Sequence, residues 1–445
     1  MTSYPVVVYV HGGAFVNGYG NQYSPESIAS KDVIGVTFNY RLGAHGFLCL
    51  RTDTAPGNAG LKDQRSALRW IQENIAEFGG NPSDVTVAGY SAGAATAEIL
   101  MLSTKTPLFD KLILESGSGL ASFALKENPV EFAKEFAALL GATDIQVASV
   151  QELEQFYMSL SFDEMFANVD LKGVPIGFSP CVENSISDLE SIIEENPIDI
   201  LRNGSYHKMP VLTGYTNGEG LIFYENRDIW LPKMATNLPE FFPTNFNLKL
   251  TATKTDVARQ INEVYFPHGF EHENVSQEFV NYFTDSMFMY GVLQSARLHA
   301  EHSDVFLYEF SFSGSLDLYH QPQLGAGHCA QTVYVLNNRQ EEVLNANDVS
   351  MRNQIVELWT NFIKYGDPVV NTSQSGIWQK LNNTRMNYLQ IDLQLSEHSW
   401  PRKGYMEFWE KMWTIKEEEK GAANLMLPGF MTLAFSGILL VFLTK

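Results

Sequence analysis

The chain has 445 residues, of which 45% are hydrophobic and 18% are charged, and its formal net charge is −21. This apolar content excludes a disordered protein, and the negative charge argues against a nucleic-acid partner because it would repel phosphate. The length allows two or three average domains or one large α/β domain.

Apolar, β-branched runs alternate with segments in which apolar residues recur at helical spacing. Such alternation predicts a mostly parallel sheet with helices on both faces. The segments 120–205 and 225–300 are mainly helical in pattern and predict a cap beside the sheet. The predicted strands are Val6–Val10, Val33–Tyr40, Val85–Ala88, Leu112–Leu114, Val211–Thr213 and Val305–Phe310, and the predicted helices are Arg65–Phe78 and Ala92–Leu102.

A glycine-rich turn, His11-Gly12-Gly13-Ala14-Phe15, directly follows the first predicted strand. Acyl transfer builds a negatively charged oxygen, and backbone N–H groups stabilise it best when they already point at it. A turn with little side-chain bulk offers such donors, and lipases and esterases carry a similar loop after a strand. A phosphate loop is the alternative reading, but no Gly-Lys-Ser/Thr sequence follows.

The segment Gly89-Tyr90-Ser91-Ala92-Gly93 is a GxSxG sequence between a predicted strand and a small-residue helix. A nucleophilic serine in this position sits on a tight turn, so small residues must flank it. The helix that starts behind it favours developing negative charge. GxSxG alone is a weak signal, and a glycine-rich turn of no chemical meaning is the alternative. Its placement between strand and helix favours Ser91 as a nucleophile.

A nucleophilic serine needs a base and a carboxylate that orients the base, and in this strand–turn–helix setting both follow the serine in the chain. His328 lies in the Gly-rich loop Gly325–His328 after the predicted strand Val305–Phe310, and Glu219 lies in a Gly-flanked loop after Val211–Thr213. A solvated loop glutamate is the alternative for Glu219. The remaining candidates lack a comparable setting and are expected to be mostly solvated: His207, His268, His272, His299, His302, His320 and His398.

Cysteines and glycosylation sequons give weaker signals. The chain has three cysteines, Cys49, Cys181 and Cys329, with no CxxC or zinc-ligand spacing. Because the number is odd, at least one thiol has no partner within the chain, and no disulfide framework is visible. Four glycosylation sequons, too short to establish secretion by themselves, stand at Asn203, Asn274, Asn371 and Asn382.

The two ends of the chain differ in character. The N-terminus lacks a basic region followed by an apolar core, so no signal peptide is predicted. Residues 416–424 are acidic and small and predict a linker, and Leu425–Leu443 form an apolar run about as long as a bilayer core is thick. A membrane anchor, a cleaved lipid-anchor signal and a buried terminal helix are three readings of this run, and the membrane readings are favoured because Pro428-Gly429 would interrupt a soluble helix.

Taken together, the motifs resemble those of the type-B carboxylesterase/cholinesterase family, and their amino-acid sequences are most similar to those of insect carboxylesterases. They occur in family order and the likeness extends to about Trp413. The matching segments are PVVVYVHGGAF, NYRLGAHGFL, PGNAGLKDQ, ALRWIQENIAEFGGNP, GYSAGA, LESGS, GYTNGEGLIF and GAGH. The resemblance implies an α/β-hydrolase fold over residues 1–415, no cofactor, no metal, a small-molecule ester as substrate, and a protein of the secretory pathway. It leaves the oligomeric state open.

The family's roles carry over to matching positions. The resemblance implies that Ser91 is the nucleophile, Glu219 the acid and His328 the base. It implies that the backbone amides of Gly13, Ala14 and Ala92 form the oxyanion hole, and that Arg41 and Asp63 form a structural ion pair. Alanine at position 14, where the family more often has glycine, is expected to be tolerated only at negative φ.

The sequence departs from the family in several places. Tyr90 replaces a more usual Glu before the nucleophile, and Cys329 and Gln331 stand where acidic residues are more common. The segment that precedes the HGG loop in the family, about a hundred residues with the first strands and the choline-binding aromatic, is not part of this sequence. We therefore expect missing N-terminal strands, with Val33–Tyr40 as an unprotected edge of the sheet.

Three functional hypotheses follow. The first is a carboxylic ester hydrolase that acts through an acyl-enzyme. The second is a non-catalytic adhesion or binding protein, because the family includes members that have lost the catalytic residues. The third is an incomplete, inactive form. An intact Ser/Glu/His set favours the first over the second, because binding alone would not require it.

Overall fold

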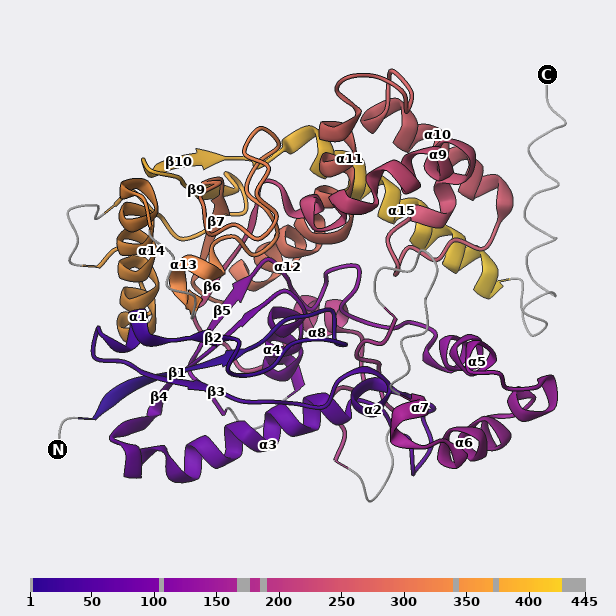
Figure 1. Ribbon diagram of the computed structural model, residues 1–445, viewed down its shortest axis with the longest axis horizontal. Helices are drawn as coiled ribbons and strands as arrows, with labels where there is room; N and C mark the ends of the chain where they lie inside the picture. The colour runs from indigo at the N-terminus through magenta and orange to yellow at the C-terminus, as the bar shows by residue number, and fades with distance from the viewer. Residues whose placement is uncertain are drawn as a thin grey trace, which may run out of the picture.

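In the computed structural model, eight strands form a central sheet in the order β10-β9-β7-β6-β5-β4-β1-β3 (Figure 1). The structure describes residues 3–103, 108–165, 177–184, 190–338, 344–370 and 376–425. Neighbouring strands are parallel except β9 and β10, so the prediction of a mostly parallel sheet is confirmed. The strands are β1 (Tyr4–Val10), β3 (Ile34–Thr37), β4 (Gly80–Tyr90), β5 (Lys111–Glu115), β6 (Val211–Thr216), β7 (Val305–Phe310), β9 (Asn387–Ile391) and β10 (Ser396–Ser399), and β2 (Tyr23–Ser24) pairs separately with β8 (Asn337–Asn338).

Both faces of the sheet are covered, which is why its strands are almost continuously apolar in sequence. Alternate residues of a strand point to opposite faces. In β1, Val6, Val8 and Val10 join one hydrophobic cluster, and Val7 and Tyr9 join the other. The cluster around Val7 and Tyr9 includes the apolar side of α14 (Ala346–Tyr365), and the opposite cluster includes residues of α3 (Ala59–Asn74), α4 (Ala92–Ser103) and α12 (Tyr290–Ala300).

Most remaining helices come from the two segments predicted as a cap. In Figure 1, α5, α6 and α7 form one group, and α9, α10, α11 and α15 form another on the same side of the sheet. The helices not yet given are α1 (Glu26–Ala29), α2 (Gly43–Phe47), α5 (Pro129–Leu139), α6 (Val150–Ser159), α7 (Phe162–Met165), α8 (Pro197–Asn203), α9 (Arg227–Asn237), α10 (Thr251–Tyr265), α11 (Val275–Phe283), α13 (Thr332–Val335) and α15 (Lys403–Leu425), with short turns η1 (Ile75–Phe78), η2 (Asp144–Val147), η3 (Glu219–Asn226), η4 (Leu238–Phe241) and the π-helical η5 (Thr284–Met289).

The strand predicted over Val33–Tyr40 is shorter in the structure. It leaves the sheet at Phe38, where the backbone of Gly20 packs against it and the Gly20 amide donates to the Asn39 side chain at 2.8 Å. Within the described residues β3 pairs only with β1, so this strand forms the edge of the sheet, as expected.

Residues 416–424, predicted from the sequence as a linker, form the last turns of the helix α15. Polar contacts hold it: Lys416 Nζ lies 2.7 Å from the Glu127 carboxylate, and Glu419 accepts the amides of Lys249 and Leu250 at 2.6 and 2.9 Å. These amides stand just before α10, where a negative charge is favourable. The apolar run beyond Leu425 lies outside the described residues, and no described helix is long and apolar enough to cross a membrane.

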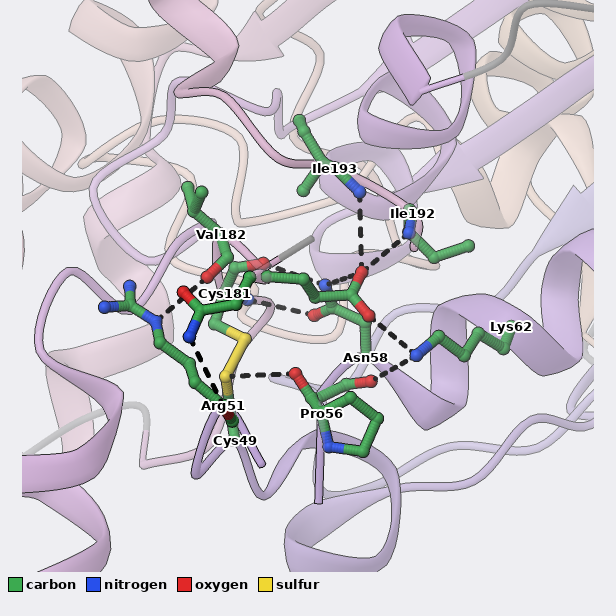
Figure 2. The surroundings of a disulfide bond; sticks show 12 residues. Cys49, Arg51, Pro56, Asn58, Lys62, Cys181, Val182, Ile192 and Ile193 are labelled. Atoms are coloured by element: carbon green, nitrogen blue, oxygen red, sulfur yellow. Dashed lines mark hydrogen bonds and ion pairs between the residues drawn. A yellow bond between two sulfur atoms is a disulfide. The ribbon is translucent and has the colours of Figure 1, made fainter. Parts of the chain in front are cut away.

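A disulfide joins Cys49 and Cys181 across 132 positions of the chain, and Cys329 is the free cysteine (Figure 2). No pairing was visible in the sequence because the two cysteines meet only through the fold. The bond leaves no room for a side chain at Gly57. A Cβ there would stand 2.5 Å from Cys181 Sγ and 2.8 Å from Cys49 Sγ, and the glycine has φ +104°.

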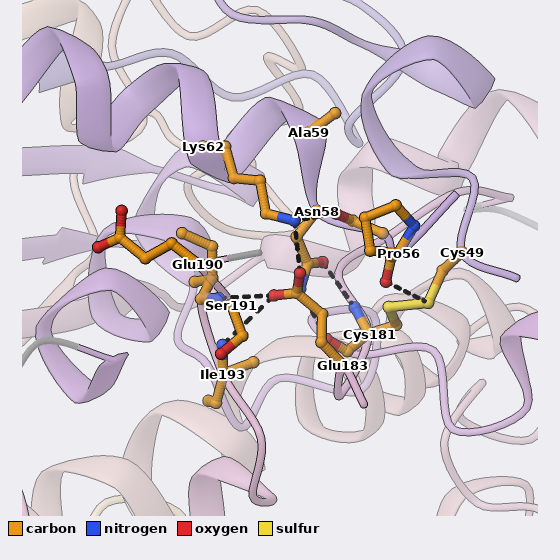
Figure 3. Close-up of polar contacts among 12 residues, drawn as sticks. Cys49, Pro56, Asn58, Ala59, Lys62, Cys181, Glu183, Glu190, Ser191 and Ile193 are labelled. Atoms are coloured by element: carbon orange, nitrogen blue, oxygen red, sulfur yellow. Dashed lines mark hydrogen bonds and ion pairs between the residues drawn. A yellow bond between two sulfur atoms is a disulfide. The ribbon is translucent and has the colours of Figure 1, made fainter. Parts of the chain in front are cut away.

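Polar groups reinforce the same junction (Figure 3). The side-chain amide of Asn58 donates to the Cys181 carbonyl and accepts from the Cys181 amide, at 2.8 and 2.9 Å. Glu183, 4% exposed, accepts from Asn58 Nδ2 and the Ile192 amide at 2.9 and 2.7 Å, and pairs with Lys62 at 2.6 Å. Residues 181–183 are therefore bound covalently to the segment after α2, and through buried hydrogen bonds to the start of α3.

We expect the double substitution Cys49→Ser, Cys181→Ser to lower stability by about 2–4 kcal/mol, because a disulfide that closes a long loop restricts the unfolded chain most. Thermal unfolding followed by circular dichroism measures this. Cys329→Ser is the matched control and should unfold within a degree or two of the wild type. An unchanged midpoint in the double variant would show that the polar contacts alone hold the junction.

Candidate active site

Ser91 occupies the sharp turn between β4 and α4, with φ +56° in the left-handed region. The turn is crowded by backbone. A Cβ at Gly89 would lie 2.4 Å from the Gly93 carbonyl oxygen, and a Cβ at Gly93 would lie 2.2 Å from that of Val10. The Ser91 amide donates to the Glu115 carbonyl oxygen of β5 at 2.8 Å. The small residues of the GxSxG sequence are thus required by the geometry, and the serine side chain stands clear of the turn.

The structure brings Ser91, His328 and Glu219 into one hydrogen-bonded line. His328 Nε2 lies 2.8 Å from Ser91 Oγ, and His328 Nδ1 is hydrogen bonded to Glu219 Oε2. Glu219 is fully buried and His328 is 5% exposed. With the proton on Nδ1 donated to the carboxylate, Nε2 is free to accept from the serine hydroxyl. This is the geometry that a serine nucleophile with a general base requires.

Hydrogen bonds fix the loops that carry the acid and the base, and two of the side chains involved, Asp317 and Asn217, were not singled out from the sequence. Glu219 Oε1 accepts the Thr216 amide at 2.7 Å. Asp317 accepts the Gly327 amide and Asn217 accepts the Ala326 amide, at 2.7 and 2.8 Å. Both Asp317 and Asn217 follow strands that end at the same edge of the sheet as Ser91. Their position after these strand ends is the one sequence feature that could have marked them as site residues.

An aromatic ring supports the histidine directly. Phe288 of the π-helical turn η5 lies 4.6 Å from the His328 ring, centroid to centroid, and Phe123 lies 5.3 Å from Phe288. A π-helical turn is rare and frequently occurs at functional sites. Nothing in the local sequence predicted this turn, because its register is set by the packing of η5 against the rest of the cap.

The other candidate histidines are mostly exposed, as expected, and His299 is the exception among them. His299 is fully buried: its Nε2 lies 2.9 Å from Glu98 Oε1 and its Nδ1 lies 2.9 Å from the Tyr206 hydroxyl. His299 is buried because it lies on the inner face of α12, opposite α4. The criterion applied to the sequence, a Gly-rich loop after a strand, does not detect a histidine buried on a helix.

The loop His11–Phe15 lies against the serine turn, since a Cβ at Gly12 would stand 2.9 Å from Ser91 Cβ. Among the described residues, no group accepts a hydrogen bond from the amides of Gly13, Ala14 or Ala92, so these three donors are free to bind a ligand oxygen. Ala14 has φ +54°, and the expectation of a negative φ is wrong. The turn is closed by the amides of Val16 and Asn17, which donate to the Gly13 carbonyl and force the left-handed backbone.

At the departures from the family pattern the structure places neutral groups. Tyr90 is 8% exposed, its ring packs on that of Tyr23 with centroids 5.7 Å apart, and burial raises the pKa of its hydroxyl. Burial also raises the pKa of the Cys329 thiol well above its usual value. Gln331 Nε2 donates to Ser116 Oγ at 3.0 Å. All three side chains are therefore uncharged at neutral pH.

Arg41 and Asp63 form the expected ion pair with two side-chain hydrogen bonds, at 2.8 and 2.7 Å. Asn203, Asn274 and Asn382 are exposed, and Asn371 lies outside the described residues. In the described part of the chain, no group of three or more His, Cys, Asp or Glu side chains is arranged to hold a metal ion.

The chain is similar in sequence to a known protein family and to several of its members. A model of the carboxylesterase family matches residues 1–409. Juvenile hormone esterase of Heliothis virescens is 33% identical over 87% of this chain and 71% of its own length, and neuroligin-2 of Mus musculus is 29% identical over 91% of this chain and 51% of its own. The chain thus spans about half the length of the neuroligin.

Among solved structures, juvenile hormone esterase from Manduca sexta, with OTFP covalently attached, has a TM-score of 0.83 and 30% identity. The match covers 93% of this chain and 81% of that one. It confirms the α/β-hydrolase fold that the sequence predicts.

Because Ala14 holds a left-handed conformation that glycine adopts without strain, we expect Ala14→Gly to keep the amide in place and to raise the unfolding free energy by up to about 1 kcal/mol. Ala92→Gly, at a helical position, is the control and should lower stability by about as much. Urea unfolding of the two variants measures both effects. A clear loss of stability in Ala14→Gly would mean that the alanine methyl makes contacts that outweigh its strain.

Proposed function

Because this chain belongs to the carboxylesterase family, we propose that it is a carboxylic ester hydrolase with Ser91 as nucleophile, His328 as base and Glu219 as the acid that orients the base. The observation that carries the proposal is the hydrogen-bonded line from Ser91 Oγ through His328 to the buried Glu219. A protein that only binds a partner would not need a buried carboxylate, an imidazole and a strained serine in this hydrogen-bonded arrangement.

The reaction would proceed in two steps. His328 Nε2 takes the hydroxyl proton as Ser91 Oγ bonds to the ester carbonyl carbon, and the carbonyl oxygen becomes negative. The tetrahedral species collapses, the bond to the alcohol oxygen breaks, and His328 returns the proton to the leaving alcohol. A water molecule then attacks the acyl-serine by the same route and releases the carboxylic acid. The carboxylate of Glu219 orients the imidazole and stabilises the imidazolium that forms.

The amides of Gly13, Ala14 and Ala92 are proposed to bind the negative oxygen. Their freedom from partners among the described residues supports this role, and donors fixed before the reaction need no reorganisation when the charge develops. This chemistry needs no cofactor and no metal.

The similarity to neuroligin-2 keeps a non-catalytic binding protein as the second candidate. The two candidates differ at the serine, because an adhesion protein would not need Ser91 to react. The Cys49–Cys181 disulfide supports a location in the secretory pathway, where such bonds persist. Membrane attachment through the apolar C-terminal run stays a prediction, and deleting residues 425–445 tests it by membrane fractionation.

We expect Ser91→Ala, His328→Ala and Glu219→Gln each to lower kcat for a short-chain aryl ester by about 10⁴-fold or more, because members of such a set act as a unit. Initial rates against p-nitrophenyl acetate measure this. His299→Ala tests a buried histidine outside the line and should keep most of the kcat if it remains folded.

A fluorophosphonate probe separates an active esterase from a binding protein. We expect covalent labelling of the wild type and none of Ser91→Ala, and one relative already carries a covalently attached ligand. A folded wild-type protein that neither turns over the ester nor takes up the probe would favour the non-catalytic candidate.

A further inference from the structure

Glu115 is a buried carboxyl group beneath the serine turn. It is the last residue of β5, paired in register with Tyr90 on one side and Gly214 on the other, and it is fully buried. Its carbonyl oxygen accepts the Ser91 amide at 2.8 Å. The residue that fixes the backbone of the proposed nucleophile therefore also places a carboxyl group in the core.

Three donors from three different elements converge on that carboxyl group. Oε1 accepts from Tyr9 of β1 at 3.2 Å and from Trp359 of α14 at 2.7 Å. Oε2 accepts from the hydroxyl of Thr332. Thr332 begins α13, four residues after His328. The side chain of Glu115 thus connects α13, which follows the loop of His328, to β1 and α14, and its backbone connects the sheet to the nucleophile.

We propose that Glu115 is a positioning residue for both Ser91 and His328, and that loss or gain of its proton changes the rate of ester hydrolysis. The inference rests on the proposed function. Its geometric basis is the pair of bonds by which one residue holds the Ser91 amide and the first residue of α13.

The surroundings of the group determine when it becomes charged. The titratable groups facing it are Tyr9 of β1, Tyr308 of β7 and Cys329 of the base loop, and burial keeps all three neutral by raising their pKa values. Burial also raises the pKa of Glu115 to about 7, and its three hydrogen bonds oppose this rise. The Glu115 carboxyl group therefore gains or loses its charge near neutral pH. The charge of Glu219, the other carboxylate nearby, also raises the pKa values of Tyr308 and Cys329.

The charged form is the better support for catalysis. A carboxylate accepts all three donors as charge-assisted bonds, which are stronger than neutral ones, so it holds Thr332 and the base loop more firmly. Its negative charge also favours the imidazolium of His328 in the transition state. The protonated form is neutral and close in shape to a glutamine. Glu115→Gln therefore keeps this position uncharged at every pH.

The experiment measures kcat and KM from about pH 5 to 9 for the wild type and Glu115→Gln. We expect the wild type to exceed the variant about 3- to 10-fold in kcat at about pH 8, with similar KM, because charged hydrogen bonds exceed neutral ones by about 1 kcal/mol. The ratio should fall towards one below about pH 6, where both carry a neutral group. A ratio that is independent of pH would overturn the proposal.

Glu309→Gln is the matched control. Glu309 is also a buried strand carboxyl, its pKa is raised by burial, and it accepts from Tyr215 at 3.0 Å rather than from the loops of Ser91 or His328. The ratio of wild type to this variant should not change with pH. Thr332→Val removes one donor while leaving Glu115 in place, and it should lower kcat at about pH 8 as well, which keeps the test decisive if Glu115→Gln fails to fold.

Stability gives a readout that does not depend on the esterase function. A carboxyl group whose pKa is raised on folding binds more protons in the native state, so it lowers stability as pH rises from the ordinary value of 4.5 to about 7. Glu115→Gln lacks this term, so its unfolding midpoint should rise relative to the wild type over that window. If the wild type is inactive, the proposed function fails while this shift still reports the ionisation. A constant difference in midpoint would contradict the ionisation itself.

Discussion

The close approach of backbone around Ser91 is the constraint on which the rest of the site depends. The turn touches the loop after β1, the start of α4 and the loop after β5. A Cβ at Gly12, Gly89, Gly93 or Gly117 would meet a backbone oxygen at 2.2–2.6 Å. Because these segments cannot separate, the amides of the HGG loop stand beside the serine, and the serine hydroxyl stands at the end of the sheet where the other loops arrive.

The loops at the ends of β5, β6 and β7 complete the site, and buried polar side chains hold each of them. Glu115 ends β5, Glu219 follows β6, and Asp317 lies in the long connection after β7. Each carboxyl group also accepts a hydrogen bond from a backbone amide or a hydroxyl: within its own loop or strand end for Glu219 and Asp317, and from α13 for Glu115. Buried polar groups are costly unless satisfied, so such bonds specify one arrangement of the loops among many that would bury the same apolar surface.

The sequence predicted the parts of this structure that have local signals. Strands buried on both faces appear as apolar runs, and Ser91, Glu219 and His328 each stand in a small-residue loop after such a run, so both the strand pattern and the candidate triad could be proposed. The strands β9 and β10 and the helix α14 could not be predicted, because their sequences mix polar with apolar residues. The two strands also lie at the edge of the sheet. The Cys49–Cys181 pair, the left-handed backbone of Ala14 and the burial of His299 depend on contacts between distant segments, which no local pattern encodes.

The junction around Gly57 has an evolutionary consequence. The two sulfur atoms occupy the space that any side chain at position 57 would need, so the cysteine pair and a larger residue at 57 exclude each other. The effect of either cysteine on fitness therefore depends on the residue at 57. A lineage could acquire the bond only on a glycine background, and once the bond has formed, the glycine becomes harder to replace than before. The order of substitutions is therefore constrained: the bond must be lost before a larger residue can occupy position 57, an epistatic coupling of that position to two cysteines 132 residues apart.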